Sequence, residues 1–85
     1  MPVISRFLGI SIVMYHRDHA PPHFHAKYGE AEATVEIQTG IATGSLSRRV
    51  ITLVNEWREL RQTELLEDWE LARQNKTLKS IPPLD

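Results

Sequence analysis

The chain has 85 residues, a formal net charge of −1 and no cysteine. This length fits one small domain over residues 1–85 and is compatible with a homodimer, because small domains bury limited surface. The composition excludes disulfides and thiolate metal sites, and it offers nucleic acid no global attraction. No apolar run approaches the roughly 20 residues of a membrane span and no signal peptide is recognisable, so we expect a cytoplasmic protein.

The first predicted element is a strand within FLGISIVMY, residues 7–15, where apolar residues occupy both faces. The following segment, HRDHAPP, is predicted to be a loop. Its two consecutive prolines are incompatible with a helix and with a regular strand ladder.

The clearest pattern in the chain is a β-hairpin over residues 23–37. Polar and apolar residues alternate on both sides of Gly29-Glu30, and glycine suits the positive φ of a type II′ turn. This register pairs Lys27 with Glu32, His25 with Thr34, His23 with Glu36, Phe24 with Val35 and Ala26 with Ala33. Polar residues meet polar ones and apolar residues meet apolar ones, as a half-buried sheet requires.

The remaining elements are a short strand near residues 41–43 and two helices. Ser47 is a good N-cap for the first helix, and a new start near Thr63 lets Trp57 and Trp69 reach one core. The tail is predicted to be extended and to dock through its apolar residues on the sheet or on a partner. The expected fold is α+β: a small antiparallel sheet of three or four strands with C-terminal helices packed on one face.

The candidate site is built on His23 and His25, which share one face of the predicted strand about 7 Å apart. As a metal site, His19, His23 and His25 offer three imidazoles to an ion such as zinc. Glu36, opposite His23, would then be an outer acceptor that orients its ring. No cysteine or further ligand is specified by the pattern.

A second interpretation is acid–base chemistry on an RNA phosphodiester, with His23, His25 and Glu36 as catalytic residues. The substrate-binding residues would be Arg17, His19, Lys27, Arg48 and Arg49, the last two at a helix N-terminus that suits phosphate. A third interpretation is a solvated or partner-covered sheet face without chemistry. The residues alone leave these alternatives open.

Three segments carry a resemblance to a known family: P-x-ISRF-x-G, DH-x-PPHFH-x-x-YG and LLEDWELAR. The chain resembles the bacterial family catalogued as domain of unknown function 4160, over essentially its whole length. Its members look like small stand-alone cytoplasmic proteins. Their genes often neighbour another small uncharacterised protein, an arrangement similar to toxin–antitoxin pairs. The matching motif positions are Asp18, His19, Pro21, Pro22, His23, Phe24, His25, Tyr28 and Gly29. His16 falls outside the motif.

The resemblance points to a small cognate protein partner and leaves the reaction unspecified. No cofactor is predicted. The first functional hypothesis is therefore a toxin-like component that acts on RNA through the histidine-rich face. The alternative is a non-enzymatic module that docks its partner or regulates through the same face, and the third is a metal-binding protein. The sequence leaves open whether the protein is an enzyme.

Overall fold

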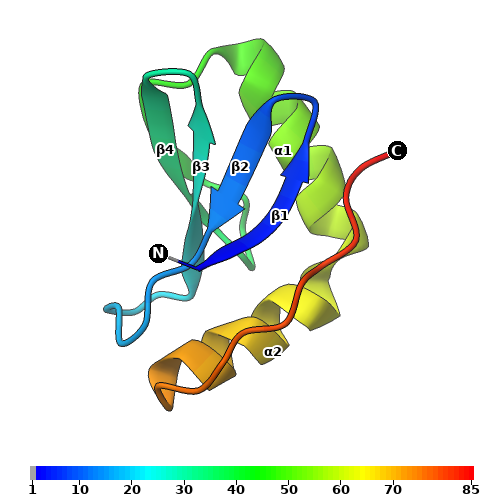
Figure 1. The fold of residues 1–85 in the computed structure, drawn as a ribbon. Helices are drawn as coiled ribbons and strands as arrows, with labels where there is room; N and C mark the ends of the chain where they lie inside the picture. The colour runs from blue at the N-terminus through cyan, green and yellow to red at the C-terminus, as the bar shows by residue number, and fades with distance from the viewer. Residues whose placement is uncertain (1) are drawn as a thin grey trace.

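The fold combines one antiparallel sheet with two helices, as a computed structural model of the chain shows for residues 2–85 (Figure 1). The elements in chain order are β1 (Val3–Phe7), β2 (Ile10–Val13), β3 (His23–Tyr28), β4 (Ala31–Glu36), β5 (Ala42–Gly44), α1 (Arg48–Leu60) and α2 (Gln62–Arg73). The strands lie in sequence order across the sheet. The predicted α+β class is confirmed, and the strands number five rather than three or four.

The strand predicted within residues 7–15 is present as β2, but the prediction missed β1 and the turn that joins the two strands. Phe7 ends β1, Leu8 and Gly9 form a two-residue turn, and Ile10 begins β2. Both turn residues have positive φ, 52° at Leu8 and 80° at Gly9, as a type I′ turn requires. Leucine is not a typical residue for that position, so the apolar run concealed the turn.

The predicted β3–β4 hairpin is confirmed in position and register. His23 pairs with Glu36, His25 with Thr34 and Lys27 with Glu32. Gly29 has φ 60°, whereas Glu30 does not enter the positive region, as expected for a type II′ turn. The short fourth strand predicted near residues 41–43 is β5. It begins one residue later than predicted, and it pairs with β4.

The two helices are confirmed, but the break between them lies at Arg61 rather than near Thr63. Ser47 caps α1, since its side chain accepts a hydrogen bond from the Val50 N–H at 3.3 Å. Arg61 leaves the helical conformation at φ −122°, and α2 begins at the next residue. Trp57 of α1 and Trp69 of α2 are both buried in one core, as the predicted break allows.

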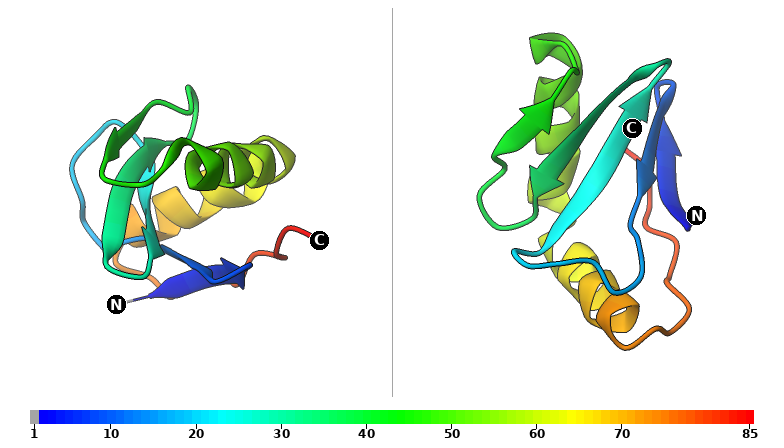
Figure 2. Two further views of the ribbon diagram at one scale, coloured as in Figure 1. Left: turned by 90° about the horizontal axis from the view of Figure 1, so that it is seen from above. Right: turned by 90° about the vertical axis from the view of Figure 1, so that its left-hand side faces the viewer.

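Helix α1 covers the apolar face of the sheet, and α2 lies under the end at which β3 begins (Figures 1 and 2). The C-terminal tail runs back along β1, where the Ile81 N–H donates to the Ile4 carbonyl at 2.8 Å. The core contains buried side chains from the sheet, both helices and the tail, among them Phe7, Ile12, Phe24, Val35, Val54, Trp57, Leu65 and Ile81. No helix within residues 2–85 is long and apolar enough to cross a membrane.

Candidate functional site

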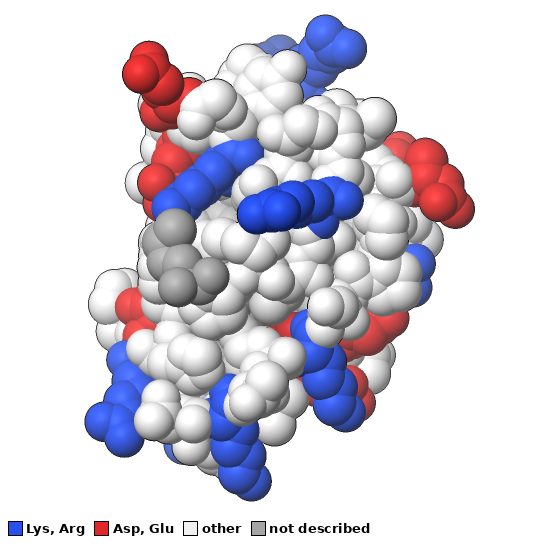
Figure 3. Space-filling model, viewed as in Figure 1, with Lys and Arg blue, Asp and Glu red and all other residues white. Residues whose placement is uncertain are grey.

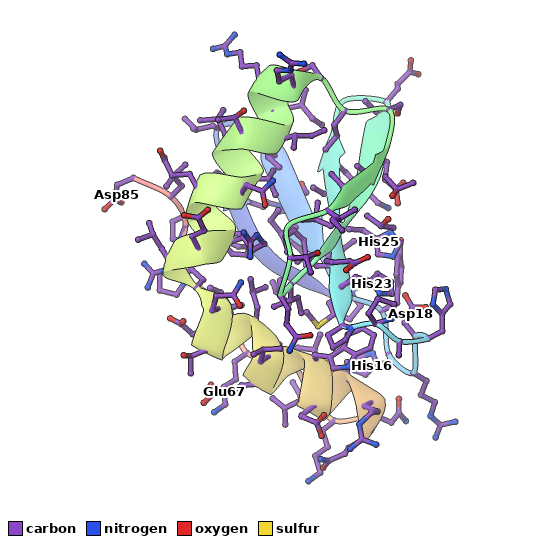
Figure 4. All side chains as sticks on the ribbon, turned by 180° about the vertical axis from the view of Figure 1, so that it is seen from behind. His16, Asp18, His23, His25, Glu67 and Asp85 are labelled. Carbon is purple, nitrogen blue, oxygen red and sulfur yellow. The ribbon has the colours of Figure 1, made fainter. Side chains whose placement is uncertain are left out.

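The site lies where the loop of residues 14–22 folds over the sheet face opposite the α1 core. The alternation of β3 places His23 and His25 on that face, and the loop brings Asp18 to them (Figure 4). His23 Nε2 is 2.9 Å from Asp18 Oδ2, and His25 Nε2 is 3.6 Å from the same oxygen. One potential ligand atom from each of the three residues lies within 4.8 Å of the other two.

The loop is held over the sheet by contacts with α2 and the segment after it. The Arg17 N–H donates to the Ala72 carbonyl at 3.1 Å, and His16 Nε2 lies 2.8 Å from the Lys76 carbonyl. These contacts join residues far apart in the sequence, and they place Asp18 between the two imidazoles.

His23 has an oxygen atom against each ring nitrogen. Its Nδ1 is 2.8 Å from the Pro21 carbonyl oxygen, which can only accept, so Nδ1 carries the hydrogen. Its Nε2 faces the Asp18 carboxylate at 2.9 Å. A bare nitrogen lone pair would be repelled by that carboxylate. A cation bound between them would remove this repulsion.

His25 is oriented in the same way by another acceptor. Its Nδ1 is 3.0 Å from Glu32 Oε2, and its ring meets the Tyr15 ring edge to face at a centroid distance of 4.5 Å. Its Nε2 is buried without a hydrogen-bond partner among residues 2–85 and points toward Asp18. Both imidazoles thus use Nδ1 for a structural contact and direct Nε2 at one carboxylate.

Asp18 is anionic in this setting. Burial alone would raise its pKa, but the His19 backbone N–H at 2.8 Å and the His23 imidazole together lower the pKa of Asp18 below its ordinary value. The site thus presents one carboxylate oxygen and two imidazole nitrogens to a common point.

A cavity of about 210 Å³ opens beside these groups. It is lined by Asp18, His19, Pro21, His23, His25, Thr34 and Glu36. Glu36 lies on β4 directly opposite His23, and its Oε1 accepts a hydrogen bond from the Thr39 hydroxyl at 2.9 Å. The loop, β3 and β4 therefore border one open cavity lined mainly by polar residues, called the polar cavity below.

A family model described as "Domain of unknown function (DUF4160)" matches residues 9–70. The chain belongs to the DUF4160 family. The matched region runs from the β1–β2 turn into α2 and contains every residue that lines the polar cavity. No curated protein and no solved structure matches this DUF4160 chain.

Four of the predicted site residues of this DUF4160 member meet in the cavity: His19, His23, His25 and Glu36. His19 lies at the edge, with 86% of its side chain exposed and its ring 5.4 Å from that of His23, outside the convergent set. The acceptors of His23 are Asp18 and the Pro21 carbonyl rather than the predicted Glu36, because the loop approaches closer than the cross-strand neighbour.

The predicted cations do not gather at the cavity. Arg49 lines a separate hollow with Leu8 and Tyr28 at the far end of β3, where Arg48 begins α1. The Lys27 Nζ lies 5.9 Å from the centre of the Tyr15 ring. Arg17 is exposed on the loop, held there by its backbone. On the face shown in Figure 3, Lys and Arg side chains are spread over the surface rather than gathered in one patch.

Asp18 was predicted as a position of the family motif, on a loop that could swing over the face of His23 and His25, but not as a site residue. The signal was its position next to His19, in a loop that must return to the strand bearing His23. Its role depends on the path of the loop, which the residue pattern does not specify.

Proposed function

We propose that this DUF4160 domain binds a divalent transition-metal ion of the zinc class through Asp18, His23 Nε2 and His25 Nε2. One observation carries the proposal: both imidazoles are tied at Nδ1 to oxygen acceptors while their Nε2 atoms converge on one carboxylate. Imidazole and carboxylate are the ligands that such ions take in the absence of cysteine.

The distances suit an ion with minor adjustment. A tetrahedral ion with bonds of about 2.1 Å separates its ligand atoms by about 3.4 Å. The two nitrogen–oxygen distances are 2.9 and 3.6 Å, and no pair exceeds 4.8 Å. The Pro21 carbonyl and Glu32 supply the outer acceptors that fix metal-binding histidines in their required tautomer. Three protein ligands leave a fourth position open to solvent or substrate.

The surrounding charge supports a cation rather than an anion. Asp18 and Glu36 line the cavity, and Glu32 contacts His25 from its border. A polyanion would meet these three carboxylates, whereas a divalent ion is attracted by them. The buried, unpartnered Nε2 of His25 gains a partner when an ion binds.

Native mass spectrometry and titration calorimetry with Zn²⁺ test this proposal. We expect one ion per chain, removed by a chelator. Asp18→Asn and His25→Ala should each weaken binding by about 100-fold or more, beyond the 10–100-fold typical of outer partners. His19→Ala is the matched control, because this neighbouring imidazole lies outside the convergent set and its loss should leave binding intact. Metal-free wild-type protein, or unchanged binding by Asp18→Asn, would contradict the proposal.

Acid–base chemistry on RNA is the second candidate. The observation that favours it is the pair of adjacent imidazoles, 5.4 Å between ring centres, one paired with Asp18 and the other with an unpartnered Nε2. This candidate is less well supported than the cation site. The carboxylates that border the cavity would repel RNA, and Arg48 and Arg49, which could attract it, lie far from the cavity. RNA cleavage by chelated protein, abolished in His25→Ala, would favour this candidate. Docking of a cognate partner, a homodimer and a cytoplasmic location stay predictions.

A further inference from the structure

We infer that the site, once it holds its metal ion, hydrolyses small uncharged acyl esters, with Glu36 as the general base. This inference rests on the proposed metal binding and adds a reaction, a substrate class and a catalytic residue to it.

The open side of the site is formed by β4. Glu36 is registered opposite His23, and Thr34 opposite His25, so their side chains rise beside the imidazoles on the same face. Directly opposed residues in an antiparallel pair have Cβ atoms about 4.5–5.5 Å apart. Glu36 lines the same cavity as the three ligands, so its carboxylate would be within reach of a water bound at the ion's open position.

Glu36 is held in place without being used by the ligands. The Thr39 hydroxyl donates to its Oε1 at 2.9 Å, whereas the Nδ1 contacts of the two histidines go to Pro21 and Glu32. A tight turn fixes its backbone, with the Gly40 N–H on the Glu36 carbonyl at 2.9 Å. The carboxylate is therefore preorganised, and its second oxygen is available to accept a proton.

The reaction follows from these positions. The ion lowers the pKa of its water, and Glu36 takes one proton from it. The resulting hydroxide oxygen forms a bond to the acyl carbon, and the carbonyl electron pair moves to the carbonyl oxygen, which the ion's charge stabilises. When that pair returns, the carbon–alkoxide bond breaks and the leaving oxygen takes the proton from Glu36. One ester and one water give one carboxylic acid and one alcohol.

The substrate class follows from volume and charge. A cavity of about 210 Å³ admits an acyl group of a few heavy atoms but is smaller than the roughly 300–1,000 Å³ of sites that enclose drug-sized ligands. With Asp18 and Glu36 beside a divalent ion, the formal charges of the site sum to zero, so the site offers an anionic phosphodiester no net attraction. A small neutral ester meets neither obstacle. The alcohol portion of the ester would extend into solvent past His19, which lies exposed at the mouth of the cavity.

The test uses the full chain loaded with Zn²⁺, with p-nitrophenyl acetate as the neutral probe and bis(p-nitrophenyl) phosphate as the anionic one. We expect zinc-dependent cleavage of the ester above the rate of chelated protein, and no comparable cleavage of the diester. Glu36→Gln should lower kcat by about 100-fold or more, as for loss of a general base, with Zn²⁺ stoichiometry and melting temperature unchanged. Glu30→Gln, at the exposed hairpin turn, is the control and should keep the wild-type rate.

The outcomes separate the two proposals. Protein that binds no zinc refutes the metal site and this reaction together. Protein that binds zinc but leaves the ester intact, or Glu36→Gln that retains the rate, refutes only the reaction. Cleavage of the diester in preference to the ester refutes the substrate class assigned here and favours the RNA-directed alternative.

Discussion

At the scale of single residues, each imidazole of the site uses Nδ1 for a contact within the protein and leaves Nε2 for a ligand. Nδ1 of His23 is assigned to the Pro21 carbonyl and Nδ1 of His25 to Glu32, so the ring orientations exist before any ligand arrives. The cost of ordering these side chains is met during folding rather than on binding. The acceptor of His25 is a side chain and can therefore be removed by substitution.

Glu32→Ala should weaken Zn²⁺ binding by about 10–100-fold, because His25 loses the acceptor that fixes its tautomer and ring orientation. The backbone contacts of Glu32 with Ser45 do not depend on its carboxylate, so the sheet should be retained. Titration calorimetry measures the loss, with Glu30→Ala, two residues earlier in the same hairpin, as the control. Equal affinities of the two variants would show that the Glu32 contact does not orient the ligand.

At the scale of elements, the sequence predicts the structure well where neighbouring residues alone determine which strands pair. The β3–β4 hairpin was predictable to the residue, because strict alternation and Gly29 specify both register and turn. The β1–β2 hairpin was not, because Leu8 supplies a positive φ without the usual turn chemistry. The contacts of Asp18 with the two imidazoles were not predictable, since they depend on hydrogen bonds from the loop to Ala72 and Lys76, far along the chain.

Gly44 in β5 gives a test of the sheet edge. Its φ is 145°, and an added Cβ would overlap the Glu32 carbonyl oxygen and lie 2.6 Å from Ala33 Cα. Gly44→Ala should cost about 3 kcal/mol of unfolding free energy, from backbone strain and overpacking combined. Urea denaturation measures it.

Gly29→Ala is the matched control, because Gly29 also has positive φ but its Cβ would meet nothing within 4 Å. Only the conformational cost of about 1 kcal/mol should appear there. Equal losses at the two positions would mean that the close approach of β5 to β4 does not constrain the fold.

At the scale of the whole molecule, the C-terminal tail joins the sheet to both helices. The Trp57 indole N–H donates to the Pro82 carbonyl at 2.8 Å, and Asp68 of α2 accepts the Lys79 N–H at 2.9 Å. Asp68 is 1% exposed, and its Oδ2 has no hydrogen bond among residues 2–85. Burial raises the pKa of Asp68 above its ordinary value, against the smaller opposing effect of the Lys79 N–H.

The raised pKa makes Asp68 a pH-dependent element of stability. The folded state holds this proton more tightly than the unfolded state, so the stabilising contribution is complete below the ordinary pKa of 3.8. It is lost as the pH rises through the higher pKa of the folded protein. Asp68→Asn keeps the acceptor for Lys79 without the charge, so its stability relative to wild type should increase from pH 4 to pH 8.

Urea denaturation at the two pH values measures this difference. Glu56→Gln, an exposed carboxylate on α1, is the control and should show the same difference from wild type at both. A constant offset between Asp68→Asn and wild type across the range would refute the role of Asp68.

The contact between His23 and Trp69, with ring centres 5.3 Å apart, makes one of the two indoles an optical reporter of the site. Trp57 is fully buried against Phe7 and Phe24, remote in its contacts from the polar cavity. A change in the charge on the His23 ring should therefore alter the fluorescence of Trp69 more than that of Trp57. Emission from the native chain therefore combines a signal that depends on the core around Trp57 with one that depends on the occupant of the cavity beside Trp69.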